Sequence, residues 1–275
     1  MRFKKNYYYL PNEYRKKHDY CEFVVGQIED LILNKTFIEL KEHSFTFSPE
    51  FIELINKSQD DFFDLLEQHN FTKELNHTVR NSLLLSLIME TSYFLQESLQ
   101  CSLKMRMTVC FTLMRKPFLE ILIILLRILL EEDFILKFSK TKGFNPTQNS
   151  PEEKKELLSK ANKLLGNIYV TDDLFDIIFC KQNEESLYTM TNLATHLYSD
   201  RTVIKTEIQN LNFIFSTEED IKSQWEYIYN NTPMIISFLA DLIDLLVFKS
   251  TNLEEEIFRN RRKKRNELRI ANNVE

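Results

Sequence analysis

Apolar residues recur at intervals of three and four along most of the chain, the spacing that is typical of amphipathic helices. The first such segment runs from Glu13 to Leu33. Long helices are predicted from Thr72 to Leu99, from Lys104 to Phe138 and from Thr217 to Phe248. No segment shows the sustained alternation of apolar and polar residues that favours a strand. The pattern therefore predicts an all-α protein.

Local start signals place several shorter helices. Ser48-Pro49-Glu50 predicts a helix that continues to about Gln68, and Ser150-Pro151-Glu152 and Thr171-Asp172-Asp173 predict two more. A further helix is expected from about Asn183 to Tyr198. Together these elements predict a helical bundle of long kinked helices with additional N-terminal helices. The expected regions are 1–70 (N-terminal helices), 71–250 (the bundle) and 251–275 (a basic C-terminal helix or tail).

Ile121 to Leu130 is one of the most apolar runs in the chain, and Arg127 interrupts it. Ten residues fall short of the roughly 20 that a bilayer span requires, so this run predicts a buried core helix and no membrane segment. We expect Arg127 to extend to the surface or to pair with Glu131, one turn later. Pro117 lies just before the run and should kink the helix, because proline lacks a backbone N–H.

The composition excludes several classes of protein. Only three glycines occur, so the clustered glycines of phosphate-binding loops and dinucleotide folds cannot be present. The four cysteines are widely separated and no secretory signal is evident, which favours reduced thiols and a cytoplasmic location. The five histidines form no recognisable metal motif with other ligands, so neither a metal nor another cofactor is expected.

Charge is distributed unevenly along the chain. The net charge is −6, but residues 259–269 contain seven basic residues and one acid, which leaves −12 for the remainder. A basic segment of this kind can bind nucleic acid or an acidic protein surface. The candidate contacts are Arg261, Arg262, Lys263, Lys264 and Arg265. A solvated and poorly ordered terminus is the alternative.

Arg115 and Glu120 stand on either side of Pro117 and are candidates for a working site. Five residues apart, they diverge on a regular helix, but a kink at Pro117 can turn both toward one cavity. Arg115 would then bind an anion and Glu120 would accept or carry a proton. An ion pair that seals the helix junction is the alternative interpretation.

A second candidate is the series Asn192, His196 and Asp200, whose spacing of four places all three on one face of a continuous helix. Histidine is the side chain best suited to proton transfer near neutral pH. A histidine that is hydrogen-bonded within the bundle, or half exposed on it, is the alternative.

These segments carry a resemblance to known proteins. Tyr93–Ser98, Val109–Glu120 and Asn192–His196 resemble uncharacterised bacterial helical proteins related to the HEPN superfamily, whose members occur in toxin–antitoxin, abortive-infection and CRISPR-linked defence. The resemblance implies a metal-independent ribonuclease-like site in which Arg115 contacts phosphate, His196 transfers protons and Glu120 or Asn192 positions them. It also implies RNA, a cognate antitoxin or defence protein, and a second copy of the chain as partners.

The usual HEPN signature, an arginine followed by a histidine after four to six residues of one helix, does not occur here. The arginine and histidine lie on separate predicted helices and must meet in space. Two other hypotheses remain: a non-catalytic helical protein-interaction module, and nucleic-acid binding through the basic C-terminal segment alone.

Overall fold

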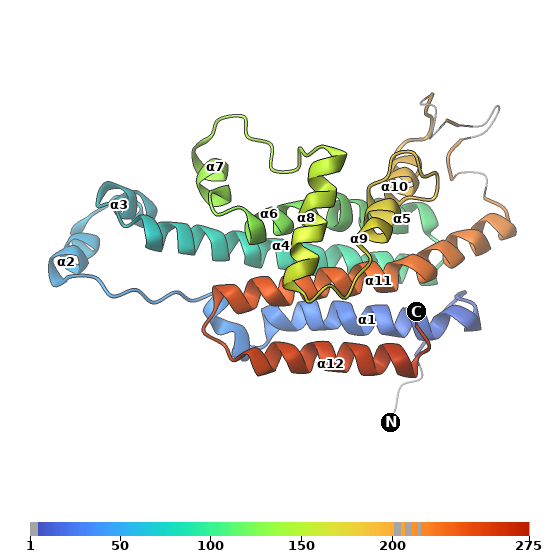
Figure 1. Cartoon of the computed structure of the whole chain (residues 1–275), viewed down its shortest axis with the longest axis horizontal. Coiled ribbons are helices and arrows are strands. Elements are labelled where there is room, and N and C mark those ends of the chain that lie inside the picture. Colours follow the sequence, from blue (N-terminus) through green and yellow to red (C-terminus); the bar gives the residue numbers. More distant parts are fainter. Residues whose placement is uncertain (1–4, 201–204, 207–210, 214–215, 275) are drawn as a thin grey trace.

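The computed structural model describes residues 5–200, 205–206, 211–213 and 216–274, which contain helices and no strand (Figure 1). The predicted all-α fold is confirmed. Four long helices run side by side: α1 (Asn12–Leu33), α4 (Thr72–Leu103), α11 (Glu218–Ser250) and α12 (Glu255–Ala271). The apolar positions that recur along the first segment are buried between them, including Tyr20, Val24, Ile28 and Leu31.

A second group of helices packs on α4. The chain turns back after α4 into α5 (Met107–Arg115), the short helix η2 (Lys116–Ile121) and α6 (Leu122–Leu130). Leu122, Ile123, Leu125 and Leu126 are fully buried, which confirms the predicted core helix. The helix expected to continue to Phe138 ends at Leu130, and α7 (Phe134–Lys140) follows as a separate element. Next along the chain, α8 (Pro151–Leu164) packs on α6 and against α9 (Thr171–Ile178), which contacts α10 (Leu187–Thr195).

The expected kink at Pro117 takes the form of a π-helical turn, η2. Proline has no N–H to donate, so the regular ladder of α-helical hydrogen bonds is interrupted here. The amide of Leu122 instead bonds to the carbonyl of Pro117, five residues earlier. The turn is therefore wider than an α-helical one, and such turns are frequent at functional sites.

The N-terminal region differs from its prediction in one respect. Instead of one helix from residue 49 to residue 68, α2 (Pro49–Lys57) and α3 (Phe62–Gln68) are separated by a break at which Asp61 caps α3. Phe51, Leu65 and Leu66 form a small core of their own. The 3-10 helix η1 (Lys35–Leu40) lies before α2 in the chain. Helix α1 packs into the main core and not into this small one.

Three of the predicted helix starts carry a side-chain cap in the structure. Ser150 and Glu153 form a reciprocal capping box at α8, and Thr217 and Asp220 form another at α11. Ser48 caps α2 through the amide of Phe51. In each case the side chain bonds an amide that has no partner within its own helix.

In length and apolar composition, α11 passes the test for a membrane-crossing helix, the one helix to do so among the described residues. In this structure 72% of its most apolar window is buried inside the bundle. The absence of a membrane segment and the cytoplasmic location stay predictions.

Candidate functional site

Arg115 and Asn192 join the end of α5 to α10. Arg115 donates a hydrogen bond from Nη1 to Asn192 Oδ1 over 3.0 Å. Asn192 is 3% exposed and donates from Nδ2 to the carbonyl of Tyr188 at 2.6 Å, which fixes the orientation of its amide. One third of the Arg115 side chain remains exposed. The guanidinium is therefore held in place at the edge of the solvent.

Glu120 lies on the same side of the helix as Arg115. Its Oε1 is 4.0 Å from Arg115 Nε, and its side chain is 48% exposed. Residues five apart diverge on an α-helix, but a π-helical turn closes through bonds between residues five apart, and this wider turn brings them closer together around the helix axis. The π turn at Pro117 is thus the reason that the two side chains meet, at the outer limit of an ion pair.

Arg115 remains able to bind an anion. Among the described residues, its hydrogen-bonded partner is a neutral amide, and the carboxylate that it pairs with, Glu120, is half exposed and 4.0 Å away. The charge of the neighbouring Lys116, by contrast, has a carboxylate partner, because Lys116 pairs with Glu90. Its ammonium group also lies over the ring of Phe94. An arginine held without full charge compensation is suited to bind a carboxylate or phosphate group.

His196 lies just beyond these residues. It caps the C-terminus of α10 in an extended conformation, so the predicted helical face of Asn192, His196 and Asp200 is wrong beyond His196. The helix ends here because Asn212 Nδ2 donates to the His196 carbonyl at 2.7 Å and Thr206 bonds the backbone of Ser199. These partners are distant in sequence, so no local pattern reveals them.

The imidazole of His196 is exposed. In the part of the chain that the structure describes, it makes no hydrogen bond or ion pair with Arg115 or Glu120. It follows Asn192 by four residues, just beyond the end of α10 at Thr195. A cleft of about 430 Å³ borders this segment, and its lining includes Leu193, Thr206 and Asn212. The structure thus brings together Arg115, Glu120 and Asn192, and leaves the exposed His196, four residues after Asn192, outside these contacts.

Arg127, the charged residue within the apolar run, has a structural role. Arg127 is 7% exposed and donates to both carboxylate oxygens of Glu131, at 2.8 and 3.1 Å, and to the carbonyl of Pro146 at 2.9 Å. Its guanidinium also lies over the rings of Phe134 and Phe144. The predicted pair with Glu131 is confirmed, and the contacts commit Arg127 to holding the loop after α7.

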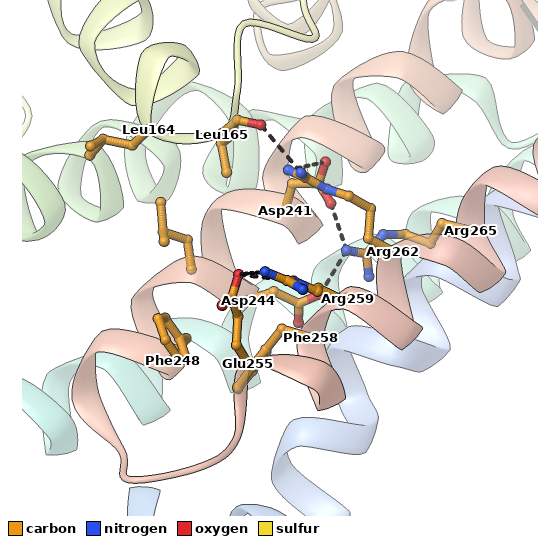
Figure 2. Close-up of a pocket in the computed structure, with 11 residues that line it drawn as sticks. Leu164, Leu165, Asp241, Asp244, Phe248, Glu255, Phe258, Arg259, Arg262 and Arg265 are labelled. Atoms are coloured by element: carbon orange, nitrogen blue, oxygen red, sulfur yellow. Dashed lines mark hydrogen bonds and ion pairs between the residues drawn. The ribbon is translucent and has the colours of Figure 1, made fainter.

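The basic C-terminal segment forms an ordered helix, α12, so the alternative interpretation of a poorly ordered terminus is wrong. Arg265 Nη2 donates to Asp241 Oδ1 at 2.6 Å and Asp244 Oδ2 at 2.7 Å, and Arg261 Nε donates to Asp244 Oδ1 at 2.9 Å (Figure 2 draws Arg265 with both carboxylates). Arg265 is 2% and Arg261 8% exposed. Burial alone would lower the pKa of Arg265, but the charges of Asp244 and Asp241 outweigh burial and raise the pKa above its ordinary value.

Only some of the five residues predicted to contact nucleic acid are therefore accessible to it. Arg261 and Arg265 are buried and cannot reach a polyanion. Arg262, one third exposed, pairs with Asp241 and donates to the carbonyl of Leu165. Lys263 and Lys264 alone of the five predicted contacts are fully on the surface. The signal that could have shown this is the pair of acids at 241 and 244 within an apolar helix, since buried carboxylates require cationic partners.

No cluster of three or more potential metal ligands occurs among the described residues. Comparisons with protein-family models, with curated proteins and with solved structures find no match to this chain. What the protein does is therefore inferred from its own residues.

Proposed function

We propose that this protein is an HEPN-like intracellular effector that acts on RNA through a metal-independent, ribonuclease-like site, in phage defence or toxin–antitoxin growth control. The observation that supports this most directly is the hydrogen bond from Arg115 to Asn192. It joins the two segments that carry the resemblance and holds an incompletely neutralised guanidinium against Asn192, four residues before the exposed His196.

The roles follow from the chemistry of each group. Arg115 binds the phosphate and stabilises the extra negative charge that develops on it during attack. His196 takes the proton of the ribose 2′-hydroxyl, and that oxygen attacks the phosphorus. The bond to the 5′-oxygen breaks, the leaving oxygen takes a proton from solvent and His196 returns its proton to solvent, so the products are a 2′,3′-cyclic phosphate and a free 5′-hydroxyl. Asn192 and Glu120 position Arg115.

The test combines growth with a direct assay of cleavage. Bacteria are induced to express wild type, Arg115→Ala, Glu120→Ala or His196→Ala at matched protein levels, and their RNA is separated by size. Purified proteins are then incubated with end-labelled RNA in excess EDTA, and the termini of the products are identified. We expect wild type to fragment RNA, and each variant to cleave RNA at a rate at least about 100-fold lower than that of wild type.

Two matched controls separate the site from general effects. Arg106→Ala changes an exposed arginine at the other end of α5, and His69→Ala changes another exposed histidine. Both should keep wild-type activity. Arg115→Lys preserves the charge and tests whether loss in Arg115→Ala reflects the binding of phosphate rather than misfolding. Wild-type protein that leaves RNA intact both in cells and in the purified assay contradicts the proposal.

A non-catalytic interaction module is the second candidate function. It is favoured by Leu197 and Tyr198, which follow His196 and are 60% and 67% exposed. In that case Leu197→Asp and Tyr198→Asp should abolish capture of a partner protein, such as a cognate antitoxin or defence protein, while His196→Ala should not. Light scattering of the purified protein tests the proposed second copy of the chain.

A further inference from the structure

The linker between η1 and α2, residues 42–48, leads to the small core of α2 and α3 at one end of the molecule (Figure 1). It is irregular, and among the described residues no amide from His43 to Ser48 donates to another backbone group. Burial alternates along it, because His43, Phe45 and Phe47 are half-buried and the residues between them are exposed. Alternate side chains of an extended segment share one side. The linker is therefore held to the protein chiefly by these three rings.

His77 of α4 is the residue on which two of the linker rings pack. The centre of its ring lies 5.2 Å from that of His43 and 5.9 Å from that of Phe45, and both contacts are edge-on. Phe47 continues the contact into the small core, because its ring lies 5.1 Å from that of Phe51. Two titratable rings, His43 and His77, therefore belong to the contact that holds the linker on α4.

Asn81, one turn after His77 on α4, favours the neutral form of that imidazole. Asn81 is completely buried, and its Nδ2 lies 3.2 Å from His77 Nε2 and donates to the carbonyl of Ser250 at 3.4 Å. An amide nitrogen only donates, so His77 Nε2 accepts here and carries no proton. A flipped amide would place its oxygen against the Ser250 carbonyl. Protonation of His77 Nε2 therefore breaks the contact with Asn81.

No carboxylate neutralises a charge on either histidine of the linker contact, because the one histidine–carboxylate pair in the described chain is that of His18 with Glu22. Burial lowers the pKa of His43, and the charge of His77 lowers it further. Within one helical turn of His77, or next in the chain to His43 and Ser250, lie three cations and two acids: Lys73, Arg80 and Lys249, and Glu42 and Glu74. Neither acid pairs with a histidine, so added protons remain uncompensated.

We propose that His43 and His77 form a pH-sensitive switch that holds the linker on α4 while both rings are neutral and releases it when they are protonated. A first proton places a charge against the other ring, and a second adds repulsion between like charges. In the released linker His43 is solvated and regains its ordinary pKa of 6.5. The linker is therefore held fully above about pH 6.5 and is released progressively below it. The packing of α3 on α4 is separate from this contact.

Limited proteolysis of the full-length protein measures this release. A protease that is active at both pH 7.5 and pH 5.5 is used, and the rate of cleavage within residues 42–48 is measured by mass spectrometry. This rate is divided by that of a free peptide of residues 40–50, which corrects for the pH dependence of the protease. The ratio reports the released fraction when opening and closing are fast. We expect it to rise about three- to tenfold from pH 7.5 to pH 5.5, since one suppressed proton changes the equilibrium by about tenfold per pH unit.

Three variants assign the release to this pair of histidines. His43→Phe keeps an aromatic ring and cannot be protonated, so its ratio should stay low at both pH values. His43→Lys places a permanent charge beside His77, so its ratio should already be raised at pH 7.5. His69→Phe is the matched control, because it replaces a histidine that packs on Phe51 in the small core. It should keep the pH dependence of wild type.

Three results would overturn the proposal: a wild-type ratio that is the same at pH 7.5 and pH 5.5, an equal rise in His43→Phe and wild type, or a low ratio in His43→Lys at pH 7.5. Circular dichroism of each protein at both pH values accompanies the digests. Loss of helix together with faster cleavage would assign the rise to global unfolding, and this too contradicts a local switch.

Discussion

Arg265 on α12 and Asp241 on α11 form a buried ion pair, with 2.6 Å between Nη2 and Oδ1 and exposures of 2% and 4%. The same nitrogen also reaches Asp244. The last helix is thus attached to the bundle by almost completely buried charges, as well as by apolar side chains such as Phe258. Removal of one partner from such a pair leaves the other buried and uncompensated.

Arg265→Ala is therefore expected to lower the free energy of unfolding by about 3–5 kcal/mol. Lys264→Ala, at the adjacent exposed position, should change it by less than about 0.5 kcal/mol. Urea denaturation followed by circular dichroism measures both. A cost below about 1 kcal/mol for Arg265→Ala would show that water enters to solvate the two carboxylates.

Glu22 makes stability dependent on pH in the acid range. Burial acts to raise its pKa, but hydrogen bonds from His18 and Lys5, together with their charges, outweigh this and lower the pKa from 4.5 to about 2. A carboxylate whose pKa is depressed by folding stabilises the protein fully at pH values above the pKa that it has in the unfolded chain. This stabilisation is lost as the pH falls through the pKa that it has in the folded protein. The urea midpoint should fall steadily between pH 4.5 and pH 2.

Glu22→Gln should be less stable than wild type at pH 6, and its midpoint should fall less over that acid range. Glu29→Gln, two turns along α1, provides the matched control. If wild type and Glu22→Gln show parallel decreases between pH 4.5 and pH 2, the contacts of Glu22 do not survive in solution.

Tyr229 connects two buried polar groups. Its hydroxyl lies 2.9 Å from His18 Nδ1 and 2.5 Å from Ser102 Oγ, and all three residues are completely buried. Tyr229→Phe leaves the imidazole nitrogen without its partner, which should cost about 1–3 kcal/mol. Tyr14, whose ring stacks on that of Tyr229, has a hydroxyl with no hydrogen bond in the described chain, so Tyr14→Phe should be nearly neutral. Thermal and urea denaturation of the two variants provide the comparison.

Arg127 and Lys160 both form ion pairs with a glutamate one helical turn away, but only Arg127 is buried. Arg127→Lys should cost about 1–3 kcal/mol, because lysine cannot bond both oxygens of Glu131 or cover Phe134 and Phe144 with a planar group. Lys160→Ala, in a pair with both side chains more than half exposed, should cost less than about 0.5 kcal/mol. Similar costs for the two would mean that the guanidinium contacts contribute nothing.

Much of the helical framework could be predicted because its causes are local. Ser150 and Thr217 cap their helices through residues three positions later, and the apolar run at Ile121–Leu130 is buried as its composition requires. The π turn could be foreseen only as a kink at Pro117. The break between α2 and α3 was missed, although Asp61 is a residue that commonly caps a helix.

The candidate site was predictable in part for the same reason. The spacing of Arg115 and Glu120 around a proline indicated a distorted turn, and the structure places the two side chains together. The end of α10 at Thr195 was not predictable, because Thr206 and Asn212 determine where the chain leaves the helix.

The sequence by itself determined that the chain is helical, where most helices begin and which apolar run is buried, since these properties depend on residues within a few positions of one another. Only the tertiary structure decided what the charged groups do. The arginines of α12 read as a free basic segment, yet Asp241, Asp244 and Asp30 neutralise Arg261 and Arg265. Those partners lie between 17 and 231 positions away, and an ion pair forms between residues that folding brings together, whatever their separation in sequence.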